Sequence, residues 1–90
     1  MYNINFTSTG TATLEHFSAR EQEQILYVLN KVVAEFDETQ IESNRLTDIG
    51  DGFYIVKVNH LIRVMTKIKD NSFRIINVFN KTNSKELALT

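Results

Sequence analysis

Apolar and polar residues follow a strand pattern in three short runs of the second half of the chain. The runs cover residues 52–59, 61–68 and 72–81, and they are rich in β-branched and aromatic side chains. The breaks at residues 59–60 and 69–72 contain Asn, His, Lys, Asp and Ser, most of which are common in turns. Strand-forming runs with such short connections are typical of an antiparallel β-meander.

The first half of the chain begins with a strand pattern and continues with a helix pattern. Residues 2–6 alternate between apolar and polar types, which predicts a short strand. Residues 7–13 are rich in Thr, Ser and Gly and predict a loop or a frayed helix start. The residues that can line a short first helix are Ala12, Leu14 and Phe17. Ser18 and Glu21 then form a Ser-x-x-Glu capping box, which predicts the start of a second helix.

The second helix carries one apolar stripe over about three turns, which we expect to lie in the core. The stripe consists of Ile25, Leu26, Leu29, Val32, Val33 and Phe36. We expect the helix to end near Phe36, before the polar residues 37–43. Residues 44–49 then predict a short strand, and residues 50–52 a turn into the meander.

Alternation within the meander separates an uncharged face from a mixed face. The uncharged face, which we expect to pack on the helices, contains Tyr54, Val56, Val58, Ile62, Val64, Thr66 and Ile68. The opposite face combines aliphatic residues with Lys57, Arg63 and Lys67. The sequence therefore predicts one α+β domain over residues 1–90: an N-terminal strand, a helical hairpin and an antiparallel β-meander.

Composition is typical of a globular protein, with 42% hydrophobic and 10% aromatic residues in 90 positions. The chain has no Cys, which excludes disulfides and thiolate zinc sites. Two His residues far apart, without Cys, predict no metal site, and no cofactor motif is present. No leader pattern and no apolar run of about 20 residues is visible, so we expect a cytoplasmic protein without a membrane partner.

The net charge of −1 hides an asymmetry between the two halves of the chain. Residues 1–44 contain seven acidic and two basic residues, a charge of −5, whereas residues 45–90 contain eight basic and four acidic residues, a charge of +4. A basic half suggests an anionic partner. The alternatives are that the charges only keep the protein in solution, or that the chain's own termini cover the mixed face.

Several short motifs in this order resemble the RelE/ParE toxin superfamily. They are Asn44-Arg45-Leu46, Phe53-Tyr54-Ile55-Val56-Lys57-Val58, Ile62-Arg63-Val64 and Val78-Phe79-Asn80-Lys81. The resemblance implies a small toxin of a type II toxin–antitoxin pair, neutralised by a cognate antitoxin. RelE-like members cut mRNA in the ribosomal A site, and ParE-like members inhibit DNA gyrase.

For a RelE-like protein the resemblance implies a metal-independent endoribonuclease that acts with the ribosome. Cations would stabilise the charge that develops on the phosphate, and an acid and a base would move protons. The residues that match the family's catalytic positions are Lys57, Arg63 and Lys81. The residues expected on the nucleic-acid or partner face are Lys67, Arg74, His60 and Met65. His60 lies in a predicted turn, where it is either an acid–base group or a solvated turn residue.

Two departures from the RelE-like pattern keep other functions open. RelE-like nucleases often place an arginine at the position of Thr82, and residues 84–90 contain no Tyr or His. The alternatives are therefore a non-catalytic ParE-like inhibitor, for example of DNA gyrase, and a degenerate, non-toxic binding module.

Overall fold

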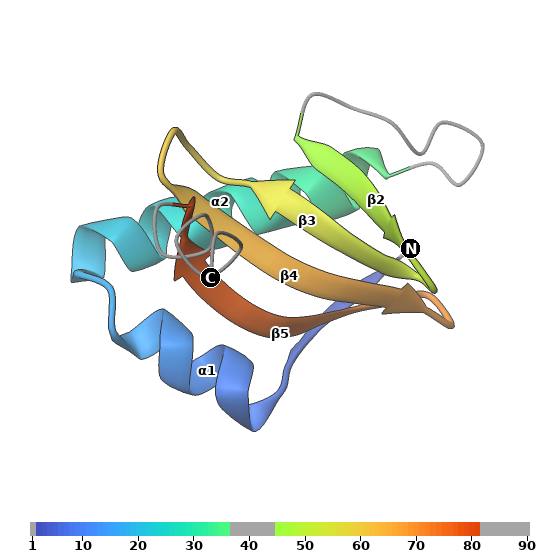
Figure 1. Cartoon of the computed structure of the whole chain (residues 1–90), viewed down its shortest axis with the longest axis horizontal. Coiled ribbons are helices and arrows are strands. Elements are labelled where there is room, and N and C mark those ends of the chain that lie inside the picture. Colours follow the sequence, from blue (N-terminus) through green and yellow to red (C-terminus); the bar gives the residue numbers. More distant parts are fainter. Residues whose placement is uncertain (1, 37–44, 82–90) are drawn as a thin grey trace, which may run out of the picture.

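The structure, a computed structural model, describes residues 2–36 and 45–81. Its elements are β1 (Asn3–Phe6), α1 (Ser8–Glu15), α2 (Ala19–Glu35), β2 (Leu46–Gly50), β3 (Phe53–Lys57), β4 (Ile62–Lys69) and β5 (Ser72–Asn80). The five strands form one sheet in the order β1-β5-β4-β3-β2 (Figure 1). The predicted N-terminal strand, two helices and antiparallel meander are confirmed, and β1 adds to the edge of β5 in parallel.

The capping box forms as expected and fixes the start of α2. The Ser18 hydroxyl accepts a hydrogen bond from the Glu21 backbone N–H at 3.1 Å, and the Ser18 N–H donates to the Glu21 carboxylate at 3.0 Å. Two backbone donors that no helical carbonyl can reach are thereby satisfied. The helix ends at Glu35, with Phe36 as its C-cap, as predicted.

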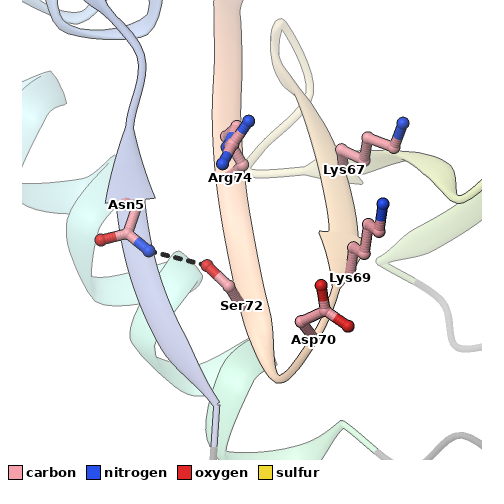
Figure 2. A pocket seen from close by; sticks show the side chains of 6 residues that line it. All are labelled: Asn5, Lys67, Lys69, Asp70, Ser72 and Arg74. Carbon is pink, nitrogen blue, oxygen red and sulfur yellow. Dashed lines mark hydrogen bonds between the residues drawn. The ribbon is translucent and has the colours of Figure 1, made fainter.

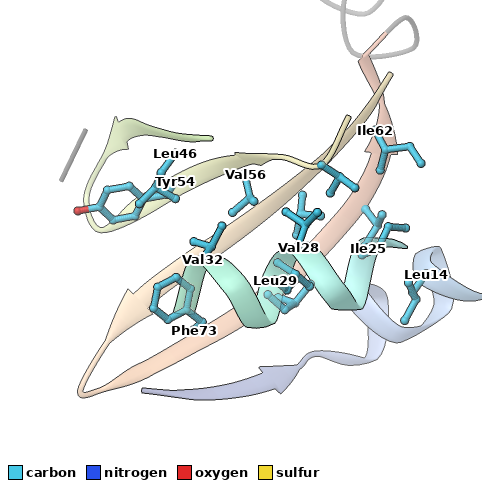
Figure 3. Close-up of a cluster of buried hydrophobic side chains, with 14 residues drawn as sticks. Leu14, Ile25, Val28, Leu29, Val32, Leu46, Tyr54, Val56, Ile62 and Phe73 are labelled. Carbon is cyan, nitrogen blue, oxygen red and sulfur yellow. The ribbon is translucent and has the colours of Figure 1, made fainter. Parts of the chain in front are cut away.

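One side of α2 lies against the sheet, but its buried stripe differs from the expected one by one position (Figure 3). Ile25, Leu29 and Val32 are buried as predicted. The prediction is wrong for Leu26, whose side chain is 39% exposed. Val28, which is 5% exposed, is buried in its place. A helix rotates about 100° per residue, so positions 25, 28, 29 and 32 share a narrower face than a stripe that includes position 26.

For residues 7–13 the sequence predicted either a loop or a frayed helix start. The structure shows a helix that begins at Ser8. The Thr7 side chain caps α1 by accepting a hydrogen bond from the Gly10 N–H at 2.9 Å. The Thr7 backbone N–H donates to the Ile75 carbonyl at 3.0 Å, so α1 starts in direct contact with β5. Tertiary contacts here outweigh the low helix propensity of Thr, Ser and Gly. Leu14 is buried and Phe17 packs against the core, whereas Ala12 is exposed.

The uncharged face of the meander packs on the helices, as predicted. The buried residues on it are Tyr54, Val56, Val58, Ile62, Val64 and Thr66, and Ile68 packs against them. The Thr66 hydroxyl, completely buried, donates to the Arg74 carbonyl at 2.9 Å. This bond satisfies a hydroxyl that would otherwise lie unpaired in the core.

The connections differ slightly from the predicted breaks. Asp70 and Asn71 alone connect β4 to β5, with φ of 52° and 61°, a left-handed conformation that Asp and Asn tolerate better than most residues. Residues 58–61 connect β3 to β4, a longer break than the predicted residues 59–60. The turn predicted at residues 50–52 is present at residues 51 and 52, because Gly50 still belongs to β2. The polar residues 37–43 and the start of the strand predicted at 44–49 lie outside the described residues.

Candidate functional site: the open face of the sheet

The face of the sheet opposite the helices, here called the open face, mixes apolar and cationic side chains. The strand register places on it Phe53, Ile55, Lys57, Arg63, Met65, Lys67, Arg74 and Phe79. Lys57 and Arg74 are exposed, and the other six are half-buried. Because none of these side chains is buried, a partner can reach all of them from this side, as far as the described residues go.

Two of the predicted catalytic residues, Lys57 and Arg63, lie directly opposite each other on β3 and β4. Like charges at such a position repel each other and destabilise the pairing of the strands. Within the described part of the chain, neither side chain pairs with a carboxylate. An anion placed between them would remove the repulsion.

Hydrogen bonds to the connection between β3 and β4 hold the guanidinium of Arg63. Arg63 Nη1 donates to the Asn59 carbonyl at 2.6 Å and to the Ile62 carbonyl at 3.2 Å. Asn59 Oδ1 in turn accepts from the backbone N–H groups of Leu61 and Ile62 at 2.8 and 2.9 Å. Among the described residues, the Nε and Nη2 donors of Arg63 have no partner, so they remain free for a ligand. The role of Asn59 was missed, although Asn in a predicted turn was its signal.

The third predicted catalytic residue, Lys81, lies at the same end of the sheet. Phe79 is opposite Arg63, and two residues later the Lys81 N–H donates to the Leu61 carbonyl at 2.6 Å. The β4–β5 ladder thus continues by one residue and brings the Lys81 backbone beside the connection that carries His60. Thr82 and residues 84–90, where the sequence departs from the RelE-like pattern, lie outside the described residues.

A fourth cation at this end, Arg45, was not predicted as a site residue. Arg45 Nη1 donates to the carbonyls of Lys57 and Val58 at 3.1 and 3.0 Å, and the Lys57 N–H donates to the Arg45 carbonyl at 2.7 Å. These bonds fix the backbone that carries Lys57. A shallow pocket here is lined by Gln24, Arg45, Lys57, Val58, Asn59 and His60. The exposed His60 therefore lies beside two cations.

The residues predicted on the partner face are spread along the sheet rather than gathered at one point. Met65 lies between Ile55 and Asn77 in the middle of the open face. Lys67 and Arg74 lie opposite each other toward the other end, and Lys67 Nζ is 4.8 Å from the centre of the Phe53 ring. Arg63 and Lys67 are four positions apart on β4, about 13 Å at strand spacing. The open face thus has a cationic region at each end and an apolar centre.

Clusters of three or more His, Asp and Glu side chains that could bind a metal are absent from residues 2–36 and 45–81. The helices in the same ranges are too short and too polar to cross a membrane. The open face offers positive charge, hydrogen-bond donors and apolar surface, a combination that suits a phosphate-bearing ligand.

In residues 2–36 and 45–81 the geometry is that of an α+β protein with two helices on one face of a five-stranded sheet and a cationic open face, and the fold is that of RelE toxins. The isolated E. coli RelE toxin matches it with a TM-score of 0.70 and 14% identity, over 99% of this chain and 98% of the other. The YoeB–YefM complex from Staphylococcus aureus matches with a TM-score of 0.65 and 17% identity, over 88% of this chain and 95% of the other. The E. coli DinJ–YafQ toxin–antitoxin complex matches with a TM-score of 0.64 and 11% identity, over 91% of this chain and 94% of the other.

These likenesses confirm, for the fold, the resemblance to the RelE/ParE superfamily that the strand motifs suggested. No family model matches the sequence, and neither does any curated protein. The short, degenerate motifs of the sequence are consistent with these low identities: the fold is similar, whereas most side chains differ.

Proposed function

We propose that this protein is the toxin of a type II toxin–antitoxin pair and cleaves mRNA on the ribosome in the cytoplasm. The observation that carries the proposal is the Lys57–Arg63 pair, two cations directly opposite each other on the open face of a RelE-like fold. The solved structures with this fold include toxins alone and toxins bound to their antitoxins.

In the proposed reaction, cations of this chain bind and neutralise the phosphate that is attacked. The free Nε and Nη2 donors of Arg63 can contact two phosphate oxygens at once, while Lys57 contributes a point charge from the neighbouring strand. Lys81, at the same end, adds a third positive charge. His60 is the proposed proton donor or acceptor, because its imidazole lines the same pocket as Lys57.

The proposed antitoxin is an acidic segment with apolar side chains that lies across the open face. Ile55, Met65 and Phe79 are half-buried there and offer apolar contact, and the cations at both ends offer charge complementarity. Binding should protect the backbone amides of β3 and β4 from hydrogen exchange. Lack of protection in the presence of the protein encoded by the neighbouring gene would contradict this partner.

One observation favours a second candidate, the non-catalytic ParE-like inhibitor. Arg63 Nη1 is already bonded to the Asn59 and Ile62 carbonyls, so Arg63 also supports the connection between β3 and β4. A residue that positions a turn can support a binding surface without taking part in catalysis. The two candidates differ in whether ribosome-bound RNA is cut.

The test compares two variants that keep the fold with a control on the other side of the molecule. Arg63→Ala removes the turn contacts and lowers stability by about 1 kcal/mol, so loss of toxicity would be ambiguous in that variant. Lys57→Gln and Arg63→Lys retain more of the packing, and Lys31→Gln removes one charge from an exposed position on α2. We expect ribosome-dependent RNA cleavage to fall at least about tenfold in the two site variants and not in the control.

Growth inhibition and melting curves complete the test. Toxicity and cleavage lost together, at an unchanged melting temperature, support the interferase. A wild-type protein that inhibits growth without cutting RNA supports the ParE-like inhibitor. Full cleavage by both Lys57→Gln and Arg63→Lys proteins would refute the proposed site.

A further inference from the structure

A second cationic pocket lies at the opposite end of the open face, near the turn between β4 and β5 (Figure 2). It has a volume of about 380 Å³ and is lined by Asn5, Lys67, Lys69, Asp70, Ser72 and Arg74. These residues come from three adjacent strands and one turn, so paired strands supply most of the pocket.

The pocket repeats the charge arrangement of the first site. Lys67 and Arg74 are directly opposite each other on β4 and β5, as Lys57 and Arg63 are on β3 and β4. Lys69 follows Lys67 on the same side of β4, which gives three cations in one pocket. The carboxylate of Asp70 lines the pocket, but within the described residues none of the three cations forms an ion pair with it. Uncompensated repulsion at two places on one face favours an anionic ligand at both.

The uncharged side chains of the pocket are arranged to donate hydrogen bonds. Asn5 Nδ2 donates to Ser72 Oγ at 2.7 Å, which occupies a lone pair of that oxygen and leaves the Ser72 proton available (Figure 2). Arg74 adds a guanidinium fork that can contact two oxygens. Lys67 lines the pocket on its β4 side (Figure 2), and its Nζ lies 4.8 Å from the centre of the Phe53 ring on β3, so it turns toward the pocket only when a ligand draws it there. Hydroxyl, guanidinium and ammonium donors around one space match the oxygens of a phosphate group.

We infer that this pocket binds a phosphate group and that it is a separate subsite from the Lys57–Arg63 pair. The Cα atoms of Arg63 and Lys67 are about 13 Å apart along β4. Arg63 Nη1 is bonded to the Asn59 carbonyl and Lys67 Nζ lies over the Phe53 ring, so in this arrangement one phosphate does not contact both side chains. This inference rests on the proposed function: the ligand is a backbone phosphate of the same single-stranded RNA, at a different position from the phosphate of the reacting bond. Free inorganic phosphate offers the same chemistry, and the experiment separates the two sources.

The first arm of the experiment uses inorganic phosphate with the wild-type protein. Amide chemical shifts are followed by NMR during titration, with sodium chloride at matched ionic strength as the control for screening. We expect saturable shifts at Lys67, Ser72 and Arg74 with phosphate alone. Arg74→Gln should weaken this binding about fivefold or more, and Lys31→Gln should leave it unchanged. Asp70→Asn, which removes the one carboxylate of the pocket, should strengthen it about twofold or more.

The second arm replaces phosphate by a short single-stranded RNA in which 2′-deoxy nucleotides prevent cleavage. Binding that is tighter than that of phosphate, and weakened by both Arg74→Gln and Lys57→Gln, assigns the subsite to the RNA backbone. Phosphate binding without RNA binding keeps the subsite and assigns it to free phosphate, while the proposed RNA function fails. Absence of phosphate-specific shifts at the pocket, or shifts that are equal in Arg74→Gln, overturns the inference whatever the toxicity of the protein.

Discussion

Gly10→Ala tests the contact that fixes α1 on the sheet. A Cβ at residue 10 would clash with the Ile75 carbonyl oxygen and would lie 3.0 Å from the Ile75 carbonyl carbon. Both atoms belong to the backbone of β5, which is paired on one side with β4 and on the other with β1. Because β5 is held on both sides, it cannot move away easily, and α1 would have to shift outward.

The expected cost follows from two opposing terms. In an exposed helix, replacing Gly by Ala stabilises by about 1 kcal/mol. Overpacking against rigid backbone costs about 1–3 kcal/mol, and an outward shift also strains the hydrogen bonds from Thr7 to the Ile75 carbonyl at 3.0 and 3.1 Å. We therefore expect a net loss of about 2 kcal/mol. In a domain of this size that corresponds to a decrease of roughly 10 °C in melting temperature.

Thr11→Ala is the matched control, because Thr11 is the next residue of the same helix and is exposed. It changes helix propensity alone and should raise the melting temperature by a few degrees. Thermal unfolding followed by circular dichroism measures both variants. If Gly10→Ala stabilises the protein as much as Thr11→Ala does, α1 does not pack on β5 as described and the reasoning is refuted.

Two further predictions concern the core and are measured by urea unfolding. Leu29→Ala should cost about 2–5 kcal/mol because Leu29 is completely buried, whereas Leu26→Ala, at a position that is 39% exposed, should cost about 1 kcal/mol or less; equal losses would contradict the orientation of α2. Thr66→Val should cost about 1–2 kcal/mol because it places a methyl group where the hydroxyl now donates to the Arg74 carbonyl, and a neutral result would show that this bond does not stabilise the protein.

Much of the fold could be predicted because it follows from local patterns. Alternation correctly assigned the buried faces of β3 and β4, and the capping box correctly marked the start of α2. The parallel position of β1 and the full extent of α1 could not be predicted. Both depend on contacts with β5, more than 60 residues away, such as the Thr7 bond to Ile75. Propensity reflects only the local sequence, whereas contacts with residues distant in sequence determined the structure of these two elements.

The candidate site was predictable only in part, for a similar reason. Lys57 and Arg63 flank a short connection, so their position on one face followed from alternation alone. The hydrogen bonds that hold Arg63, and the role of Arg45, depend on side-chain directions that no pattern in the sequence specifies. The pocket at the other end was missed because Asn5 enters it from β1, whose pairing with β5 was not foreseen.

A β-bulge in β5 shows most clearly why alternation could not define the whole open face. Strict alternation from Phe73 and Ile75 would place Asn77 and Phe79 in the core as well. The register shifts by one residue opposite Met65 and Thr66, so Val78 is buried instead and Phe79 lies on the open face opposite Arg63.

The shift has two physical causes in the surrounding structure. Without it, the amide of Asn77 would have to enter an apolar core, which is costly unless every donor and acceptor is satisfied. With it, the backbone N–H of Val78 reaches beyond the end of β1, where the Thr13 hydroxyl of α1 accepts it at 2.9 Å. The helix whose extent the sequence left undecided thus stabilises the bulge that places an aromatic ring beside the proposed phosphate site. The chemistry of the open face therefore depends on the packing of the opposite face.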